Sequence, residues 1–427
     1  MTTAPWAAAA SLERLAALER ALSPDLADAL RAAGEAAREY LRRIDEQALL
    51  LYAGGNVPRP GQPQYPRLSG QPSMGYPGDK YQPGLEPLDV VEVAVTRAVS
   101  EVIGARFADV RPPSATLANL AVYTALARPG DALAVLPEWA GGHLSHHEIG
   151  AAGVRGLRVV ELPYDARELD VDLERLPSFL DRERPVLVVV GASLMLRPHR
   201  VAAIAERVHD HGACLLYDAS HVAGLVAEGR FQAPLAEGAD VMTFSTYKSF
   251  GGPAGGVIAA HDEALMARCA AAIYPGLTAN YDIARLLPLG EAALERKLAA
   301  GAYADRCIAN ARALAAALAA EGLAVLGAEH GYTSSHHVAV DVRALGGGAI
   351  AARRLAESNI LLSAIGCPAA DGPDPAGAIR IGTQSITRQG FVEDDMAAVA
   401  SALARGLREP SGELRAEVAA IRGRHRS

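Results

Sequence analysis

The sequence predicts an α/β protein, with a mainly parallel sheet in a large domain and a small α+β domain toward the C-terminus. Three short apolar runs support this prediction: PVLVVVG (185–191), ACLLYDAS (213–220) and DVMTFST (240–246). They begin 28 and 27 residues apart, and the stretch between the first two has apolar residues at helical spacing. Strand, helix and strand at this spacing are typical of parallel strands that are buried on both faces and joined by right-handed crossovers.

The N-terminal part of the chain, residues 1–56, is predicted to form a helical arm. Its leucines recur three or four residues apart: Leu12, Leu15, Leu18 and Leu22. Packing on a second subunit and a plain pair of surface helices explain this pattern equally well. Residues 57–88 follow with eight prolines and five glycines, which should prevent regular structure. Such a segment is either a disordered linker or a functional loop, and its tyrosines and GYPG turn favour an active-site loop.

The predicted domain division places the large domain at residues 57–285, including this loop, and the small C-terminal domain at residues 286–427. The second part contains long alanine-rich helical stretches and two strand-like runs, HHVAVDV (336–342) and GAIRIGT (377–383). We expect the last residues, from about 417 onward, to form a frayed helical tail.

Composition narrows the class of partner. The net charge of −8 is spread along the chain without a basic block, which argues against nucleic acid. No apolar run is long enough for a membrane span, and the start lacks the basic region of a secretory signal. The four cysteines form no CxxC pair, as expected for reduced thiols in a cytoplasmic protein. Small molecules and other subunits are therefore the expected partners.

Polar residues stand where the three apolar runs end. Ser193 follows the first run, Asp218 lies in the second, and Lys248 follows the third. The chain has only three lysines, Lys80, Lys248 and Lys297, so an amine at this place is informative. Ligands of open parallel sheets bind at the carboxyl ends of the strands, so these three side chains should converge on one rim.

An amine on such a rim can condense with the aldehyde of pyridoxal 5′-phosphate (PLP). The cofactor needs a carboxylate at its ring nitrogen, for which Asp218 is suited. Its phosphate needs the N–H groups of a helix start, which Ser114-Ala115-Thr116 can supply before the helical run LANLAVYTALA. His143 is a candidate for stacking on the ring, and Arg380 can bind a substrate carboxylate with two donors.

Each residue also has an ordinary interpretation when taken alone. Lys248 could be a surface amine, Asp218 a turn or cap residue, and Arg380 a salt-bridge partner. The histidines at 143, 146 and 147, beside Glu148, could form a metal cluster. Neighbours in sequence point in different directions on a helix, however, and no further Cys or His stands at ligand spacing. We therefore expect no metal.

Several segments together resemble serine hydroxymethyltransferases. YDASHVAGLVAEG (217–229) and DVMTFSTYKSFGGPAGG (240–256) carry the resemblance most specifically. The other matching segments are GYPGDKY, NLAVYTALARPGD, AGGHLSHH and IRIGTQSITRQGF. The resemblance extends over roughly residues 70–400. It implies the fold of the fold-type I PLP-dependent transferases, in which the large domain binds PLP, and a homodimer with active sites at the subunit interface.

The resemblance also implies a role for each site residue. Lys248 matches the lysine that holds PLP, and Asp218 matches the aspartate at the pyridine nitrogen. His143 matches the ring-stacking histidine. Arg380 matches the arginine that binds the carboxylate of the amino acid.

Further positions complete the implied cofactor site. His221 matches a histidine beside the cofactor, and Ser193 matches the serine near its phenolic oxygen. Ser114 and Thr116 match the phosphate-binding pair, although Ala115 stands where the family has glycine.

The departures from the family pattern affect the proton-handling and folate side of the pocket. Met74 replaces the glutamate that handles protons in folate-dependent hydroxymethyl transfer, Gln82 replaces an active-site tyrosine, and Tyr247 replaces a histidine. Other altered positions are Gly54-Gly55-Asn56, Pro72, Glu138 and Ala254. A methionine cannot act as a general acid or base. Met74, Gln82, Tyr247 and Glu138 are the expected specificity residues, with Met74, Gln82 and Tyr247 placed in the substrate-binding site.

The sequence thus predicts a PLP-dependent enzyme that acts at the α-carbon of a small amino acid. Folate-independent aldol-type chemistry, as in an aldolase or transaldolase with an aldehyde partner, is the leading hypothesis. Folate-dependent glycine hydroxymethyl transfer and other PLP reactions, namely transamination, decarboxylation and elimination, stay open. A non-enzymatic subunit with this fold is disfavoured, because Lys248, Asp218 and Arg380 are all retained.

Overall fold

The computed structural model describes residues 45–53, 66–369, 372–409 and 412–425, together with scattered positions between residues 17 and 43. Most of the predicted helical arm lies outside the described residues. The same holds for Gly54-Gly55-Asn56 and for the first part of the proline-rich segment, residues 57–65.

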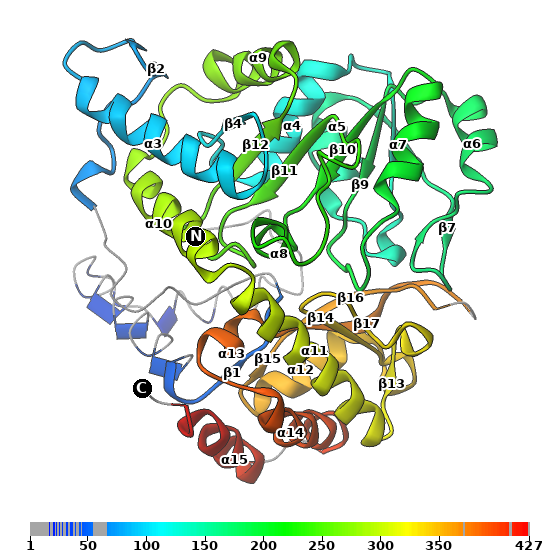
Figure 1. The fold of residues 1–427 in the computed structure, drawn as a ribbon. Coiled ribbons are helices and arrows are strands. Elements are labelled where there is room, and N and C mark those ends of the chain that lie inside the picture. The colour runs from blue at the N-terminus through cyan, green and yellow to red at the C-terminus, as the bar shows by residue number, and fades with distance from the viewer. Residues whose placement is uncertain are drawn as a thin grey trace.

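A seven-stranded sheet forms the centre of the larger part of the chain (Figure 1). In spatial order its strands are β4 (Phe107–Asp109), β12 (Gly256–Ala260), β11 (Val241–Ser245), β10 (Cys214–Asp218), β9 (Leu187–Val190), β5 (Ala132–Val135) and β6 (Arg158–Glu161). β12 is antiparallel to both of its neighbours, β4 and β11, and the pairs from β11 to β6 are parallel. The three predicted apolar runs are the adjacent parallel strands β9, β10 and β11, which confirms the predicted α/β class.

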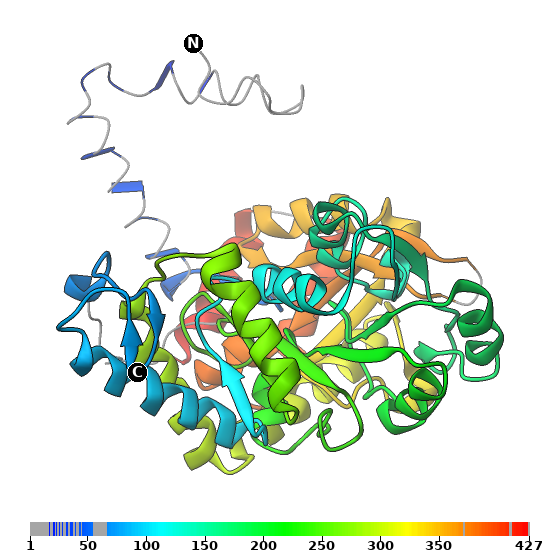
Figure 2. The same ribbon diagram turned by 90° about the horizontal axis from the view of Figure 1, so that it is seen from above.

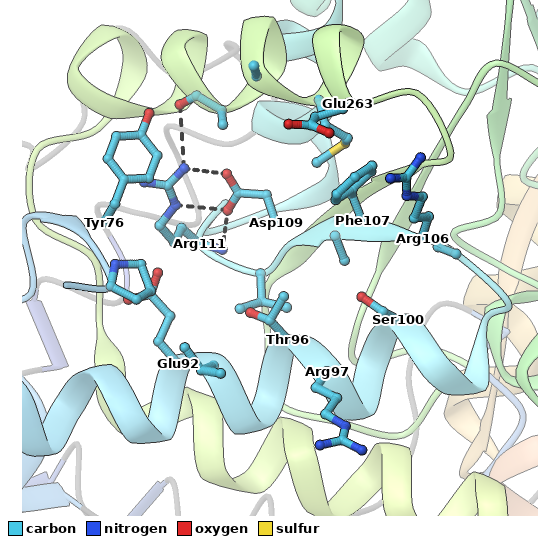
Figure 3. Close-up of a pocket in the computed structure, with 18 of the residues that line it drawn as sticks. Tyr76, Glu92, Thr96, Arg97, Ser100, Arg106, Phe107, Asp109, Arg111 and Glu263 are labelled. Carbon is cyan, nitrogen blue, oxygen red and sulfur yellow. Dashed lines mark hydrogen bonds and ion pairs between the residues drawn. The ribbon is translucent and has the colours of Figure 1, made fainter. Parts of the chain in front are cut away.

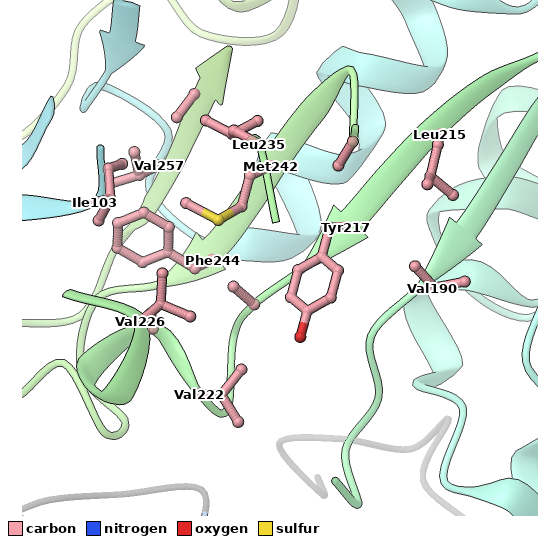
Figure 4. Close-up of a cluster of buried hydrophobic side chains, with 14 of the residues drawn as sticks. Ile103, Val190, Leu215, Tyr217, Val222, Val226, Leu235, Met242, Phe244 and Val257 are labelled. Carbon is pink, nitrogen blue, oxygen red and sulfur yellow. The ribbon is translucent and has the colours of Figure 1, made fainter. Parts of the chain in front are cut away.

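Helices cover both faces of this sheet. One face carries α3 (Glu86–Val102), α6 (Leu176–Glu183), α7 (Val201–Asp210), α8 (Ala223–Ala227) and α10 (Leu286–Ala299). The other carries α4 (Ala115–Leu126), α5 (Ala151–Arg155) and α9 (Glu263–Ala271). Successive strand residues point to opposite faces, so Leu215 and Tyr217 join the first core and Leu216 joins the second. Figure 4 shows Leu215 and Tyr217 in one layer with Met242 and Phe244.

The crossover helix between β9 and β10 follows the predicted pattern. The buried residues of α7 are Val201, Ile204, Ala205 and Val208. The chain then turns at Gly212, whose φ of +72° is a conformation that residues with a side chain rarely adopt. This short connection brings the end of β10 directly beside the end of β9.

A second, antiparallel sheet forms the smaller part of the molecule. Its strands are β13 (Ala324–Val325), β14 (His337–Asp341), β17 (Asp374–Gly382) and β16 (Ser363–Cys367). The helices associated with it are α11 (Ala302–Ala320), α12 (Gly348–Glu357), α13 (Gln384–Arg388), α14 (Met396–Arg408) and α15 (Gly412–Gly423). β14 and β17 are the two predicted strand-like runs. A parallel pair, β1 (Leu49–Leu50) with β15 (Ile360–Leu361), adds residues from near the N-terminus to this core.

The C-terminal helix corrects one expectation. Leu414, Val418 and Ile421 on α15 are buried in the core of the smaller part. The prediction of a frayed tail was therefore wrong, because three apolar side chains at helical spacing give this segment a face that packs.

The proline-rich segment is also more regular than predicted. It contains the turn η1 (Pro66–Leu68) and a hairpin of β2 (Gly75–Tyr76) and β3 (Asp79–Lys80), and α3 already begins at Glu86. Gly75 and Gly78 have φ values of +100° and +80°, which allow the tight reversal. A Cβ at Gly75 would lie 2.4 Å from the Asp79 carbonyl oxygen. The expectation of no regular structure was wrong here because glycines that interrupt a helix can close a hairpin.

The remaining elements are short. β7 (Tyr164–Asp165) and β8 (Asp170–Val171) form a hairpin. The helical turns are η2 (Glu138–Ala140), η3 (Leu144–His146), η4 (Ala272–Leu277), η5 (Ile283–Arg285), η6 (Ala328–His330), η7 (Arg343–Leu345) and η8 (Glu393–Asp395).

The division of the chain at residue 285 stays a prediction. Helices α3 and α10 lie side by side, and apolar side chains of α10 belong to the core of the seven-stranded sheet (Figure 1 and Figure 2). The next helix, α11, contributes to the core of the smaller part. Within the described part of the chain, no helix is both long and apolar enough to cross a membrane.

Candidate active site

Lys248 lies in a tight loop after β11, at the rim of the seven-stranded sheet. Its side chain is buried, and its Nζ lies 3.1 Å from Nε2 of His221. Burial lowers the pKa of the amine from 10.5 to about 8, while Asp218 raises it and Arg380 lowers it further. A substantial fraction of this amine is therefore neutral near physiological pH, as a nucleophilic amine requires.

This shift predicts how the cofactor-free protein should take up PLP. Only the neutral amine attacks an aldehyde, so the rate of covalent attachment should rise with pH and level off above about pH 8. An amine with the ordinary pKa of 10.5 would instead give a rate that still climbs about tenfold per pH unit between pH 8 and 10. Stopped-flow absorbance with free PLP measures this profile. A rate that keeps climbing to pH 10 would contradict the assignment of a buried, perturbed amine.

Asp218 ends β10 as predicted, and its carboxylate is held by three donors. Its Oδ2 accepts hydrogen bonds from Nε2 of His146 at 3.0 Å and from Nδ2 of Asn119 at 3.1 Å, and its Oδ1 accepts one from the backbone N–H of Ser220 at 2.9 Å. Burial alone would raise the pKa of Asp218, but these bonds and the nearby histidines hold it below its ordinary value. The group is thus an ionised carboxylate in a dry place, suited to a protonated ring nitrogen.

A helix N-terminus forms the wall opposite this carboxylate. Helix α4 begins at Ala115, and Oγ of its N-cap, Ser114, accepts a hydrogen bond from the N–H of Leu117 at 3.2 Å. Ser114, Ala115 and Thr116 line the same cleft as Asp218 and Lys248. Gly256 packs against this turn, because a Cβ there would lie 2.3 Å from the Ser114 carbonyl oxygen. The arrangement leaves first-turn N–H groups for an anion such as a phosphate.

His143 and Ser193 reach the cleft from two connecting segments. The Nδ1 atom of His143 lies 2.8 Å from Oγ of Ser145, and burial lowers the pKa of the imidazole to about 4, against an opposing effect of Asp218. The ring is therefore neutral and can stack on a flat cationic group. Ser193 follows β9, is buried and lines the cleft. The three strand-end residues predicted to converge, Ser193, Asp218 and Lys248, do line one cleft.

Arg380 approaches from the antiparallel sheet. It is carried by β17, and its Nη1 donates a hydrogen bond to the carbonyl oxygen of Ser193 and lies 3.4 Å from Nε2 of His221. Its Nη2 donates to Oγ of Ser363 at 3.2 Å, whereas its buried Nε has no partner among the described residues. Burial lowers the pKa of the guanidinium to about 10, so it stays cationic at neutral pH.

His221 lies at the centre of these cations. Its side chain is buried. Burial, together with Lys248 and Arg380, lowers its pKa well below the ordinary value. The side chain therefore stays neutral. Because an arginine N–H can only donate, Nε2 of His221 serves as an acceptor between the two cations.

Of the predicted specificity residues, one lines the cleft and the others do not. Tyr247 lines the cleft and is 37% exposed. Met74 and Gln82 flank the β2–β3 hairpin and do not line the cleft of their own chain, and neither do Glu138 and Ala254. The hairpin is anchored elsewhere, with the hydroxyl of Tyr76 donating to the Tyr274 carbonyl oxygen at 3.1 Å.

A separate groove of about 800 Å³ lies between α3, β4 and α9 (Figure 3). Two of its charged groups, Asp109 and Arg111, are paired with each other. Nε of Arg111 donates to Oδ1 of Asp109 at 2.9 Å, and the guanidinium stacks 4.5 Å from the ring centre of Tyr76. None of the predicted cofactor residues lines this groove, so the reactive site is assigned to the cleft of Lys248.

Two residues that bind the carboxylate of Asp218 were not predicted in their observed roles. His146 had been considered only as an unfavoured metal ligand, and Asn119 had not been singled out, yet both bind Asp218. The position of Asn119 in the second turn of α4, behind the predicted phosphate cradle, was the signal that could have identified it. Among the described residues, no group of three His, Cys, Asp or Glu side chains is arranged to hold a metal ion.

The residues of the cleft fit PLP. A buried amine, an ionised carboxylate, a neutral imidazole and a helix N-terminus line one cavity. Each supplies what one part of the cofactor needs: the aldehyde, the ring nitrogen, the ring face and the phosphate.

Comparisons with known proteins agree with this fit. A family model described as serine hydroxymethyltransferase matches residues 63–403. An alpha-methylserine aldolase of Variovorax paradoxus is 42% identical over 419 residues, which cover 97% of this chain and 95% of that protein. A serine hydroxymethyltransferase of Methanopyrus kandleri is 43% identical and covers 82% of both chains. The crystal structure of L-threonine transaldolase from Pseudomonas fluorescens, in its internal aldimine state, superposes with a TM-score of 0.82 at 26% identity, covering 92% of this chain and 90% of that one.

Proposed function

The chain belongs to the serine hydroxymethyltransferase family of PLP-dependent enzymes, and from this premise we propose that it makes or breaks the Cα–Cβ bond of a small amino acid without folate. The proposal rests on a contrast between the residues suited to PLP, which are retained, and the family's proton-handling glutamate, which is replaced. The residues suited to PLP meet in one cleft, whereas the position of the family glutamate holds Met74. The relatives named alpha-methylserine aldolase support aldol-type chemistry.

Each site residue has a separate task in the proposed reaction. When bound, PLP supplies an electron sink for a negative charge at the α-carbon. Lys248 would hold the cofactor, and its amine, with a pKa lowered to about 8, is suited to accept or return a proton. Asp218 provides the charge that keeps the ring nitrogen protonated. His143 covers one face of the ring and excludes water.

Arg380 fixes the direction of the bond that breaks. Its guanidinium can offer two N–H donors to the substrate carboxylate, in addition to the bond that holds it to Ser193. A carboxylate held in this way would fix the orientation of the substituents on the substrate α-carbon within the cleft.

A product assay separates the proposal from its alternatives. The purified enzyme is incubated with α-methylserine, L-serine and L-threonine, each with and without tetrahydrofolate. We expect the aldehyde from the Cβ fragment to appear at the same rate in both conditions. A strict requirement for tetrahydrofolate would favour hydroxymethyl transfer. Release of CO₂ or of a keto acid without aldehyde would favour decarboxylation, transamination or elimination.

The carboxylate role of Arg380 predicts a specific kinetic defect. Arg380→Lys keeps the charge but loses the paired donors, and a charge-assisted hydrogen bond contributes about 1.5–3 kcal/mol. We expect KM for the amino acid to rise about 10- to 100-fold, with a smaller change in kcat. Arg343→Lys, in a partly exposed pair with Asp341, is the matched control and should leave KM unchanged. An unchanged KM in Arg380→Lys would remove Arg380 from the substrate site.

A homodimer is part of the proposed function. Met74 and Gln82 can take part in substrate binding only if a second copy brings them to the cleft, since they do not line it within one chain. The outer surface of α3 also exposes Val90 and Val93, at 69% and 53%. Sedimentation velocity should give twice the chain mass of 44.5 kDa. A fully active monomer would exclude a shared site. The free cysteines support a cytoplasmic location within this proposal.

A further inference from the structure

We propose that Tyr123 is a positioning residue, which acts through His146 to keep the carboxylate of Asp218 ionised and directed into the cleft. The proposal rests on the assignment of PLP to this cleft under the proposed function. It concerns a residue that touches neither the cofactor site nor the substrate site, because Tyr123 does not line the cleft.

The side chains form a continuous buried chain of hydrogen bonds. The hydroxyl of Tyr123 is bonded to Nδ1 of His146, and Nε2 of the same ring lies 3.0 Å from Oδ2 of Asp218. Tyr123 is completely buried, His146 is 2% exposed and Asp218 is 5% exposed. Tyr123 and His146 are thus shielded from water, and their hydrogen bonds must be supplied by the protein.

Helix α4 holds two supports of the carboxylate on one face. Tyr123 lies four residues after Asn119, so both side chains lie on the same side of the helix. Nδ2 of Asn119 donates to the same Oδ2 atom at 3.1 Å, and Oδ1 of Asn119 accepts from Oγ1 of Thr243 at 2.6 Å. The first turn of this helix lines the cleft. One helix thus sets the distance between the phosphate cradle and the carboxylate.

The end of this chain at the carboxylate has a fixed direction. A carboxylate only accepts, so Nε2 of His146 must carry a hydrogen. The other ring nitrogen, Nδ1, is bonded to the Tyr123 hydroxyl, which can serve it as donor or as acceptor. Burial and the nearby Asp218 raise the pKa of Tyr123 well above its ordinary value, so the hydroxyl keeps its proton. Tyr123 thereby holds the ring from the side opposite Asp218 and keeps the Nε2–H group directed at the carboxylate.

Loss of the hydroxyl would leave Nδ1 of His146 without this partner. The ring could then turn about its side-chain bonds, and its Nε2–H group would no longer be held at Oδ2 of Asp218. Asp218 would lose a donor, and the pKa of its carboxyl would rise toward the value that burial favours. The other titratable groups near this carboxylate, His143 and Lys248, cannot replace the lost bond, because His143 is held by Ser145 and Lys248 faces His221.

The test is direct observation of the cofactor ring nitrogen. The holoenzyme is loaded with PLP labelled with ¹⁵N in the ring, and the NMR chemical shift reports whether that nitrogen is protonated. In Tyr123→Phe we expect the shift to move toward the unprotonated value, and kcat to fall about 10- to 100-fold with little change in KM, as for other residues that orient a ligand of a reactive centre. A wild-type shift in a folded Tyr123→Phe holoenzyme would overturn the proposal.

The chain offers a matched control. Tyr217 is also completely buried and precedes Asp218, but its hydroxyl donates to Oε1 of Gln232 at 2.5 Å, outside the network. Tyr217→Phe also removes one buried tyrosine hydroxyl, here from the residue next to Asp218 in the chain. It should leave the ¹⁵N shift unchanged, and a change equal to that of Tyr123→Phe would show a packing effect only.

A double-mutant cycle tests whether Tyr123 acts through the histidine. The side chain of His146→Gln can still donate to Asp218, but it has no second ring nitrogen for the Tyr123 hydroxyl to hold. In that background Tyr123→Phe should have no further effect on the shift, whereas an equal effect in both backgrounds would overturn the proposal. If Tyr123→Phe does not fold, His146→Leu and His146→Gln carry the test, since the shift should move only in the leucine variant. Equal shifts in these two would overturn it.

The readout needs bound PLP but no substrate turnover. A protein that lacks aldol activity and still shows the expected ¹⁵N shifts would contradict the proposed function while supporting the role of Tyr123. Aldol activity with an unchanged shift in Tyr123→Phe would give the opposite result.

Discussion

Replacement of Lys248 by alanine is expected to abolish covalent attachment of PLP and to lower kcat by about 10²- to 10⁴-fold, the range of a lost positioned proton-transfer group. The side chain is buried beside His221, and its lowered pKa makes it a nucleophile near neutral pH. The cofactor could still enter the cleft, because Asp218, His143 and the start of α4 remain. The loss should therefore appear in turnover and in covalent attachment more than in cofactor affinity.

Borohydride reduction followed by peptide mapping measures the attachment directly. The wild-type enzyme should carry the reduced label on Lys248 alone, and the variant should carry none. Lys297→Ala is the control, because this lysine is 54% exposed in a surface pair with Glu101 and lies outside the cleft. A label on Lys80 or Lys297 in the wild-type enzyme, or full activity of Lys248→Ala, would end the assignment of the site.

The second large effect is expected for stability at a fully buried ion pair. Nη1 of Arg296 on α10 donates to Oε1 of Glu228 at 2.6 Å, and both side chains are 0% exposed. Glu228 also accepts from the N–H of Ala304 on α11 at 3.0 Å. Arg296 also pairs with Glu295, which keeps Arg388 as a partner. Arg296→Met therefore leaves Glu228 as a buried carboxylate that keeps the N–H of Ala304 as a donor but has lost its cation. We expect the free energy of unfolding to fall by about 3–5 kcal/mol, measured by urea denaturation.

Two further variants separate the charge from the packing. In the double variant Glu228→Gln with Arg296→Met the unpaired charge is gone, so most of the loss should be recovered. Lys297→Ala, in the adjacent exposed pair, should cost less than about 1 kcal/mol. Burial raises the pKa of Glu228, so the loss in Arg296→Met should shrink as the pH falls and the carboxyl takes up a proton. A double variant as unstable as the single one would mean that packing around Arg296, and not the charge, gives the effect.

The fold class and the convergence of the main cleft residues were accessible from local sequence patterns. The strands β9, β10 and β11 are short apolar runs, and one parallel connection after another places their ends on one rim. The convergence of Ser193, Asp218 and Lys248 could therefore be predicted from the spacing of the apolar runs in the sequence. Ser114, Ala115 and Thr116 followed from a serine before a helical run, which is a local signal of a helix start.

The proline-rich segment and the C-terminal helix show where local reasoning failed. Composition predicted irregular structure at residues 66–88, yet two glycines with positive φ close a hairpin there. The C-terminal residues were predicted to fray, yet α15 buries three apolar side chains. In both cases the outcome depended on what the segment packs against, which composition does not contain.

By itself the sequence determined three parallel strands near the site, the amine, the carboxylate and the helix start, because periodicity and strand-end position are local properties of a chain. Only the tertiary structure decided which buried polar groups are partners. Tyr123 and His146 are 23 residues apart, and His146 and Asp218 are 72 apart, so no local pattern joins them. Their pairing follows from the need of each buried donor and acceptor to find a partner once water has been excluded.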